Sequence, residues 1–158
     1  MINKEKEINL YMLKWYSQNK RELPWRKLYE NNLPNPYYVF VSEYMLQQTT
    51  VNSVKERFIS FIIKWPNLKK LSYATEPQIL KFWSGLGYYS RAKNLLKAAK
   101  IINKKFKSKI PNNYNDLIEL PGIGDYTAKA ILGIAYNKPV MPTDANIERI
   151  IVRLFAIE

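Results

Sequence analysis

The sequence predicts an all-α protein. Apolar residues recur at the three- to four-residue spacing of amphipathic helices along most of the 158 residues, and the strict alternation typical of half-buried strands is absent. Proline, asparagine and glycine lie between these periodic segments, where helices end. The length allows one compact domain, or two small lobes that share a groove.

Four helices are expected in the first half of the chain. The first ends at Pro24 and has an apolar face formed by Ile8, Met12, Trp15 and Tyr16. Residues 27–36 are expected to form a loop, and the second helix runs from about Tyr38 to Gln48. The third ends at Pro66 and has an apolar stripe formed by Val54, Phe58, Phe61, Ile62 and Trp65. Thr75 is the expected N-cap of a short helix that buries Ile79, Leu80 and Trp83.

The second half contains further helices, separated by glycine and proline. The segment 85–87 interrupts the pattern, and Ser90 is the expected cap of a helix that buries Ala92, Leu95, Leu96, Ala99 and Ile102. A short helix over 115–120 leads to a tight hairpin at 121–124, and the next helix runs from Asp125 to about Tyr136. After a loop at 137–143, the last helix has an apolar face formed by Ile147, Ile150, Ile151 and Leu154.

The composition excludes several kinds of catalytic site. The chain has no cysteine and no histidine, so it forms no disulfide, thiolate zinc site, cysteine-held iron–sulfur cluster or Ser-His-Asp triad. Any chemistry must use carboxylates, hydroxyls, amides or lysines. No apolar run reaches the roughly 18 residues that span a bilayer, and the N-terminal residues do not open a secretory signal. We therefore expect a cytoplasmic protein that binds no membrane.

The charge indicates a polyanionic partner. The formal net charge is +12, and residues 66–109 alone hold eleven basic residues and one acid, Glu76. Four lysines lie opposite the apolar stripe of one expected helix: Lys93, Lys97, Lys100 and Lys104. They form either a solvated helix face or a set of phosphate contacts, and in both cases they strengthen the field that attracts DNA.

The segment Leu120–Ala128, with the sequence LPGIGDYTA, is a specific motif. Gly122 and Gly124 allow positive φ and close backbone approach, and they leave the first amides of the next helix pointing outward. Those amides and the positive end of the helix dipole form a phosphate site that is insensitive to base sequence. This is the helix-hairpin-helix pattern of DNA-binding proteins, in which Gly122, Ile123 and Gly124 face DNA. The alternative is a plain turn between two helices.

Four blocks of sequence resemble the helix-hairpin-helix DNA glycosylase superfamily and, within it, the A/G-specific adenine DNA glycosylases of the MutY type. The blocks are LPWR at 23–26, VSEYMLQQT at 41–49, GLGYYSRA at 85–92, and the hairpin followed by Asp144-Ala145-Asn146. The resemblance covers most of the chain and implies the helix-hairpin-helix glycosylase fold. In that fold, residues of about 25–136 form a six-helix barrel lobe, and about 1–22 and 137–158 form parts of an incomplete second lobe.

The resemblance implies a base-excision-repair enzyme that hydrolyses the N-glycosidic bond of adenine mispaired with 8-oxoguanine or guanine. This reaction needs one carboxyl group that holds a proton near neutral pH and a second that is ionised. Glu43 matches the family's acid, which protonates adenine at N7 and then helps to place water; its apolar neighbours fit a raised pKa. Asp144 matches the carboxylate that stabilises the cationic sugar. Taken alone, Glu43 is equally an exposed helix residue, and Asp144 an ordinary N-cap.

Other positions also match the family's site. Tyr126 lies where the endonuclease III branch has a lysine that attacks the sugar, so the resemblance implies a monofunctional enzyme that leaves an abasic site. Taken alone, Tyr126 is a core tyrosine beside the hairpin. Asn146 matches a residue that supports Asp144, and Ala145 replaces the glycine common in the family. Matches to the adenine pocket are Arg21, Trp25, Arg26 and Leu46, of which Trp25 is equally compatible with the core. Matches to the residues that intercalate beside 8-oxoguanine are Gln48 and Tyr88, with Gln47 close to the same site.

The resemblance also implies segments that this sequence lacks. Relatives have the rest of the second lobe, a four-cysteine loop that holds a 4Fe-4S cluster and usually a Nudix-like domain, and none of these is found here. We therefore expect a truncated chain without a cluster, with apolar surface exposed over residues 147–155 and with impaired activity. The implied partner is double-stranded DNA with an A:8-oxoguanine or A:G mispair, bound by a monomer. Two alternatives are a non-catalytic helix-hairpin-helix module that binds duplex DNA, and an endonuclease III–like bifunctional glycosylase. Tyr126 and Glu43 argue against the second of these.

Overall fold

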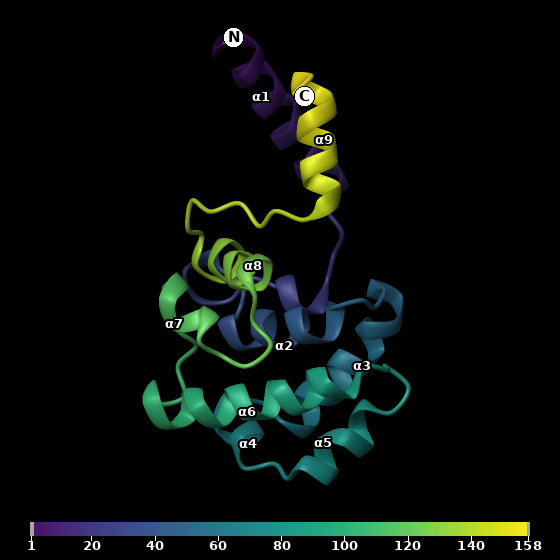
Figure 1. The fold of residues 1–158 in the computed structure, drawn as a ribbon, viewed down its shortest axis with the longest axis vertical. Helices are drawn as coiled ribbons and strands as arrows, with labels where there is room; N and C mark the ends of the chain where they lie inside the picture. The colour runs from purple at the N-terminus through teal and green to yellow at the C-terminus, as the bar shows by residue number, and fades with distance from the viewer. Residues whose placement is uncertain (1, 158) are drawn as a thin grey trace.

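Helices form the ordered elements of the protein (Figure 1). The structure is a computed structural model that describes residues 2–157, with the side chains of residues 2–4 and 30 excepted. In that part of the chain there are nine α-helices, two 3-10 turns and no strand. The prediction of an all-α protein is therefore confirmed.

The elements follow one another closely along the chain. In order they are α1 (Ile2–Asn19), η1 (Pro24–Arg26), η2 (Glu30–Asn32), α2 (Pro36–Leu46), α3 (Val51–Lys64), α4 (Leu68–Ser72), α5 (Glu76–Trp83), α6 (Tyr89–Lys105), α7 (Tyr114–Ile118), α8 (Asp125–Tyr136) and α9 (Ala145–Phe155). The predicted ends of α8 agree with the structure, and the predicted capping of α5 by Thr75 is also confirmed, since the Thr75 side chain accepts from the amide of Gln78.

Two local predictions were wrong, and one helix was not predicted. Helix α4 was not predicted, because its five residues are too few to show a period; Asn67 caps it by accepting from the amide of Lys70 at 2.9 Å. Ser90 does not cap α6 but lies within its first turn, after Tyr88, whose backbone is left-handed at φ 47°. Helix α2 ends at Leu46 rather than at Gln48, because Gln48 is also left-handed, with φ 54°.

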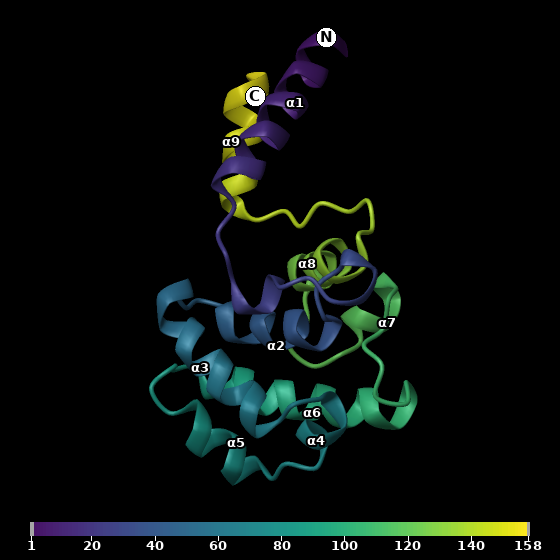
Figure 2. The same ribbon diagram turned by 180° about the vertical axis from the view of Figure 1, so that it is seen from behind.

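Helix α2 is the centre of the body and packs against α3, α6 and α8. It is buried on most sides, with Val39, Phe40, Val41, Tyr44 and Met45 all inaccessible to solvent. Helix α6 packs in turn against α4 and α5, as Figures 1 and 2 show. The hydrophobic core extends along the chain from Leu23 to Ala135.

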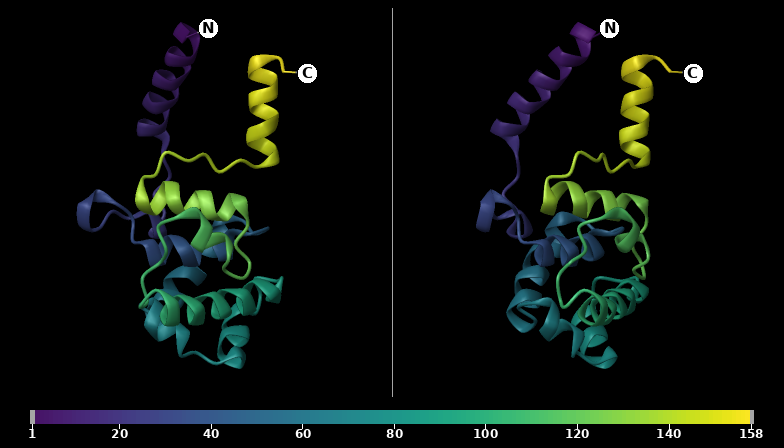
Figure 3. Two further views of the ribbon diagram at one scale, coloured as in Figure 1. Left: turned by 60° about the vertical axis from the view of Figure 1, so that its left-hand side comes forward. Right: turned by 90° about the vertical axis from the view of Figure 1, so that its left-hand side faces the viewer.

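Helices α1 and α9 extend from one end of this body and lie apart from each other in both views of Figure 3. Large apolar side chains on both helices are exposed, including Leu10 and Trp15 on α1 and Ile150 and Phe155 on α9. None of the residues described in α9 is buried, so the apolar surface expected over residues 147–155 is present. Within residues 2–157, no helix is long and apolar enough to cross a membrane.

Candidate active site

A cleft of about 600 Å³ lies where α2, α8, η1 and the segment before α9 meet. Residues 137–144 run back along α8 to the base of α9 (Figure 1), which brings Asp144 to the cleft although it lies 101 positions after Glu43. Nine predicted site residues line the cleft: Arg21, Trp25, Arg26, Glu43, Leu46, Gln47, Gln48, Tyr126 and Asp144. The fold therefore brings together residues from separate blocks of the sequence.

Glu43 lies in α2 between Ser42 and Tyr44, both of which are buried. Burial of its carboxyl group raises the pKa of Glu43 to about 7, against a smaller opposing effect of the positive charge on Arg26. Glu43 is therefore partly enclosed at the cleft rather than on an exposed helix face. Near neutral pH the side chain of Glu43 is therefore protonated in a large fraction of the molecules, as a general acid requires.

Asp144 is the N-cap of α9, and it also lines the cleft. Its Oδ1 atom accepts from the amide of Ile147 at 2.8 Å and from the amide of Asn146 at 3.1 Å. These hydrogen bonds, led by the one from Ile147, lower the pKa of Asp144. Asn146 also donates through Nδ2 to Oδ2 of Asp144 at 3.4 Å, although Asn146 itself lies outside the cleft lining. The two carboxyl groups thus have pKa values shifted in opposite directions.

Tyr126 lies in the first turn of α8 and is 43% exposed, so it is not a core residue. Burial raises the pKa of its hydroxyl group, and the negative charges of Glu43 and Asp144 raise it further. Tyr126, Glu43 and Asp144 all line the same cleft.

Trp25 and Arg26 form part of the cleft wall. Trp25 is buried and its ring packs edge-on against Phe58, with ring centroids 5.2 Å apart, so it belongs to both the core and the cleft. Arg26 Nη1 donates to the hydroxyl group of Tyr16 at 3.5 Å. Its Nε atom is buried and has no hydrogen-bond partner among residues 2–157.

The predicted hairpin joins α7 to α8. Gly122 has φ +81°, and a Cβ atom there would lie 2.9 Å from Cβ of Asn94, so this position requires glycine. Gly124 has φ −99°, so only Gly122 uses the positive φ that both glycines allow; a Cβ atom at Gly124 would face open space. No side chain caps the N-terminus of α8. The side chain of Ile123 is buried and its amide donates to Leu120 at 3.1 Å, so this residue anchors the hairpin to the core.

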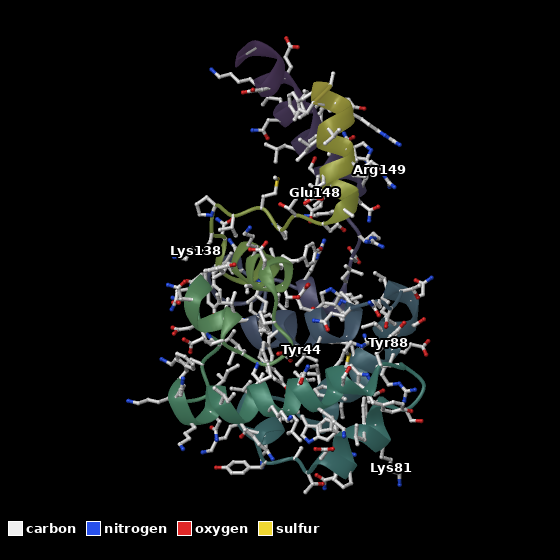
Figure 4. All side chains as sticks on the ribbon, in the orientation of Figure 1. Tyr44, Lys81, Tyr88, Lys138, Glu148 and Arg149 are labelled. Carbon is white, nitrogen blue, oxygen red and sulfur yellow. The ribbon has the colours of Figure 1, made fainter. Side chains whose placement is uncertain are left out.

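The two residues predicted to intercalate lie on left-handed turns. Gln48 lines the cleft, whereas Tyr88 lies outside it, 62% exposed, before the first turn of α6 (Figure 4). Gln47 lines the cleft beside Gln48, and its Nε2 atom donates to the carbonyl of Gly122 at 3.1 Å, which holds its side chain at the hairpin.

The cleft also contains residues that the sequence analysis did not identify. Ala130 and Ile134 line it from α8, one and two helical turns after Tyr126. That spacing was a usable signal, because residues four apart share one face of a helix. A second cavity, of about 670 Å³, lies at the other end of α2 and has Asp116 as the one acidic residue in its lining.

Nine of the 25 basic residues lie on α4, α5 and α6, and Arg21 and Arg26 line the cleft. All four lysines predicted on the outer face of α6 are exposed, and Lys93 pairs with Glu76 at 3.0 Å. Residues 2–157 contain no cluster of three or more side chains suited to holding a metal ion. An iron–sulfur cluster needs cysteine thiolates, and the chain has none, so its own residues do not fit that group.

Comparison with known proteins gives matches over most of the chain. The sequence pattern of the HhH-GPD superfamily base excision DNA repair proteins matches residues 41–158. An adenine DNA glycosylase of Buchnera aphidicola subsp. Acyrthosiphon pisum is 45% identical over 147 residues, which are 92% of this chain and 41% of the relative. The adenine DNA glycosylase of Homo sapiens is 39% identical over 150 residues, or 92% of this chain and 28% of the relative. The chain thus spans less than half the length of these curated relatives.

Solved structures of similar fold cover almost the whole chain. A thermostable thymine-DNA glycosylase has a TM-score of 0.83 and 26% identity, covering 95% of this chain and 68% of its own. An endonuclease III in a non-covalent DNA complex has a TM-score of 0.77 and 18% identity, covering 97% of this chain and 70% of its own. The second similarity concerns the fold alone.

Proposed function

Because the chain belongs to the HhH-GPD superfamily of base excision DNA repair proteins, we propose that it is a monofunctional adenine DNA glycosylase. Its substrate is adenine mispaired with 8-oxoguanine or guanine in double-stranded DNA. The observation that carries the proposal is the pair of carboxyl groups in one cleft, one with a pKa of about 7 and the other with a lowered pKa.

The reaction uses the two carboxyl groups in different protonation states. Protonated Glu43 donates its proton to N7 of adenine, so that the base leaves as a neutral molecule when the bond from N9 to C1′ breaks. Ionised Asp144 stabilises the positive charge that develops on the deoxyribose. The Glu43 carboxylate then takes a proton from water while the water oxygen bonds to C1′. The products are adenine and an abasic site.

Tyr126 supports hydrolysis rather than strand cleavage. A lyase at this position needs an amine that forms a covalent link with the sugar, and a phenol with a raised pKa is a poor nucleophile for that step. Tyr126 lines the same cleft as both carboxyl groups, and its raised pKa keeps the hydroxyl group protonated and able to donate a hydrogen bond when DNA is bound. The abasic strand is thus left intact.

The DNA contacts follow from the loops around the cleft. The uncapped N-terminus of α8 binds a backbone phosphate, and Gly124 leaves the space for its approach. Extrusion of the adenosine into the cleft leaves a gap in the duplex, which Gln48 and Tyr88 fill by hydrogen bonding and stacking. Arg21 and Leu46 border the adenine. With chromosomal DNA as its substrate, the protein acts in the cytosol of a bacterial cell.

We assign two lobes to the chain. Residues of about 25–136 form the lobe that carries Glu43, and residues 1–22 and 137–158 belong to a second lobe. Asp144 belongs to the second lobe, at the base of α9. The catalytic pair then comes from both lobes, so their relative position sets the rate of the reaction.

The test is incubation of the folded chain with duplex DNA that contains adenine opposite 8-oxoguanine, followed by hot alkali. We expect strand breaks at the adenine only after alkali. Breaks before alkali would support a bifunctional enzyme instead. Salt-sensitive binding without any product would support a non-catalytic binding module. A duplex with a normal A:T pair is the matched control and should stay intact.

A further inference from the structure

The guanidinium group of Arg91 is buried among backbone carbonyl groups. Arg91 lies in the first turn of α6, is 6% exposed, and donates to five carbonyls. Nη1 donates to Tyr44 at 3.3 Å, to Met45 at 2.8 Å and to Gln47, and Nη2 donates to Leu86 at 2.9 Å and to Gly87 at 3.1 Å. These carbonyls belong to two segments about 40 residues apart in the sequence.

The first segment is the C-terminal turn of α2. The last carbonyls of a helix have no partner within it, and Arg91 satisfies those of Tyr44 and Met45. It also binds the carbonyl of Gln47, directly before left-handed Gln48. A residue other than glycine keeps this conformation only where its surroundings impose it.

The second segment leads to Tyr88. Arg91 binds the carbonyls of Leu86 and Gly87, and the indole Nε1 of Trp83 also donates to Gly87, at 3.2 Å. The guanidinium carbon lies 5.5 Å from the ring centroid of Trp83 and 5.7 Å from that of Tyr88. The side chain of Arg91 thus holds the left-handed backbone of Tyr88 as well as that of Gln48.

The α2 turn is also bound to the hairpin. Tyr44 donates through its hydroxyl group to the carbonyl of Pro121 at 2.5 Å, and Gln47 donates to the carbonyl of Gly122. The backbone carbonyls of Tyr44 and Gln47 therefore accept hydrogen bonds from Arg91, and their side chains donate hydrogen bonds to the hairpin. Three loops that face DNA in the proposed function meet at this turn.

We propose that Arg91 is a positioning residue for mismatch recognition, which holds Gln48 and Tyr88 in one arrangement without touching DNA. The inference rests on the proposed function, because it takes these two residues as those that enter the duplex. A lysine at this position keeps the charge but has a single nitrogen, which cannot span two segments as the guanidinium fork does. Arg91→Lys should therefore release both loops.

Arg57 offers a matched control. It lies in α3 and donates to the carbonyls of Phe82 at 3.4 Å and Ser84 at 2.9 Å, so it holds only the segment before Tyr88. Arg57→Lys removes a guanidinium from carbonyl groups in the same way, but it leaves the α2 turn intact.

The first readout is hydrogen exchange in the free chain. Arg91→Lys should speed exchange over residues 46–49 and 85–88 together, whereas Arg57→Lys should affect only the second segment. Unchanged exchange in either segment of the Arg91 variant would refute the inference that Arg91 couples the two segments, and this outcome does not depend on the proposed function. If that variant does not fold, Trp83→Phe removes the indole bond to Gly87 and should speed exchange over 85–88. No change there would overturn the inference that side-chain bonds to these carbonyls hold the segment.

The second readout is discrimination, measured as the dissociation constant for a fully paired duplex divided by that for a duplex with adenine opposite 8-oxoguanine. Arg91→Lys should reduce that ratio about tenfold, on the scale of one lost stacking contact, while the salt dependence of binding stays unchanged. In a Gln48→Ala, Tyr88→Ala background, Arg91→Lys should reduce it no further. The positioning role is refuted if Arg91→Lys alone keeps the wild-type ratio, or if it lowers the ratio by the same factor when Gln48 and Tyr88 are already alanine.

A wild-type chain that does not discriminate between the two duplexes refutes the proposed function. In that case the hydrogen-exchange experiment still tests whether Arg91 couples the two segments.

Discussion

Replacement of Glu43 by glutamine should change the pH dependence of stability by a predictable amount. The pKa of Glu43 is about 7 in the folded protein against an ordinary value of 4.5. The folded state therefore holds a proton that the unfolded state has lost between these two values, so the wild-type protein loses stability as pH rises from 4.5 to 7. A difference of about 2.5 corresponds to about 3 kcal/mol at 1.36 kcal/mol per pH unit. Glutamine has no charge to bury, so the variant escapes this loss.

Urea unfolding of both proteins at a series of pH values measures the effect. The free energy of unfolding of the variant, relative to wild type, should rise by about 3 kcal/mol between pH 4.5 and pH 8. Contributions from the other carboxyl groups cancel in this difference. The variant should also bind DNA and form no abasic product. A constant difference across the pH range would refute a buried Glu43, and full activity of the variant would refute its role as the acid.

Three further predictions concern the hairpin and the cleft. Gly122→Ala should lower the free energy of unfolding by about 1–3 kcal/mol, because a left-handed residue gains a Cβ atom against Asn94. Gly124→Ala should leave urea unfolding unchanged and weaken DNA binding. Equal destabilisation by the two substitutions would contradict this geometry. Tyr126→Lys should gain strand nicking and become trapped on DNA by borohydride, so a variant that leaves only intact abasic strands would argue against the alignment of the hairpin. Asp144→Asn should keep the cap of α9, since asparagine caps as well as aspartate, but should lower the single-turnover rate about 100-fold or more; an unchanged rate would exclude its electrostatic role.

Much of the fold followed from local signals in the sequence. The hairpin glycines mark the start of α8, and the Thr75 side chain marks the start of α5. The left-handed residues could not be found in this way, because Gln48 and Tyr88 lack the usual signal of glycine. Their conformations depend on contacts with distant segments. Tertiary structure therefore decided where α2 ends and where α6 begins.

The candidate site was predictable where a motif carried it. Glu43 and Asp144 lie in recognisable blocks, but only the fold shows that both line one cleft. Arg91 lies in such a block too, yet an arginine within a helix is normally a surface residue, so its burial could not be inferred. Ile123 shows the opposite case, because its position in the hairpin motif suggested a DNA contact, whereas its side chain packs in the core.

The most direct test of the two-carboxylate account is the single-turnover rate of abasic-site formation as a function of pH, on duplex DNA with adenine opposite 8-oxoguanine. The rate should fall as pH rises through about 7, where Glu43 loses its proton, and it should also fall in acid, where Asp144 becomes neutral. The Glu43→Gln variant should show no product at any pH. Abasic product from that variant, or none from the folded wild-type chain at any pH, would contradict the account.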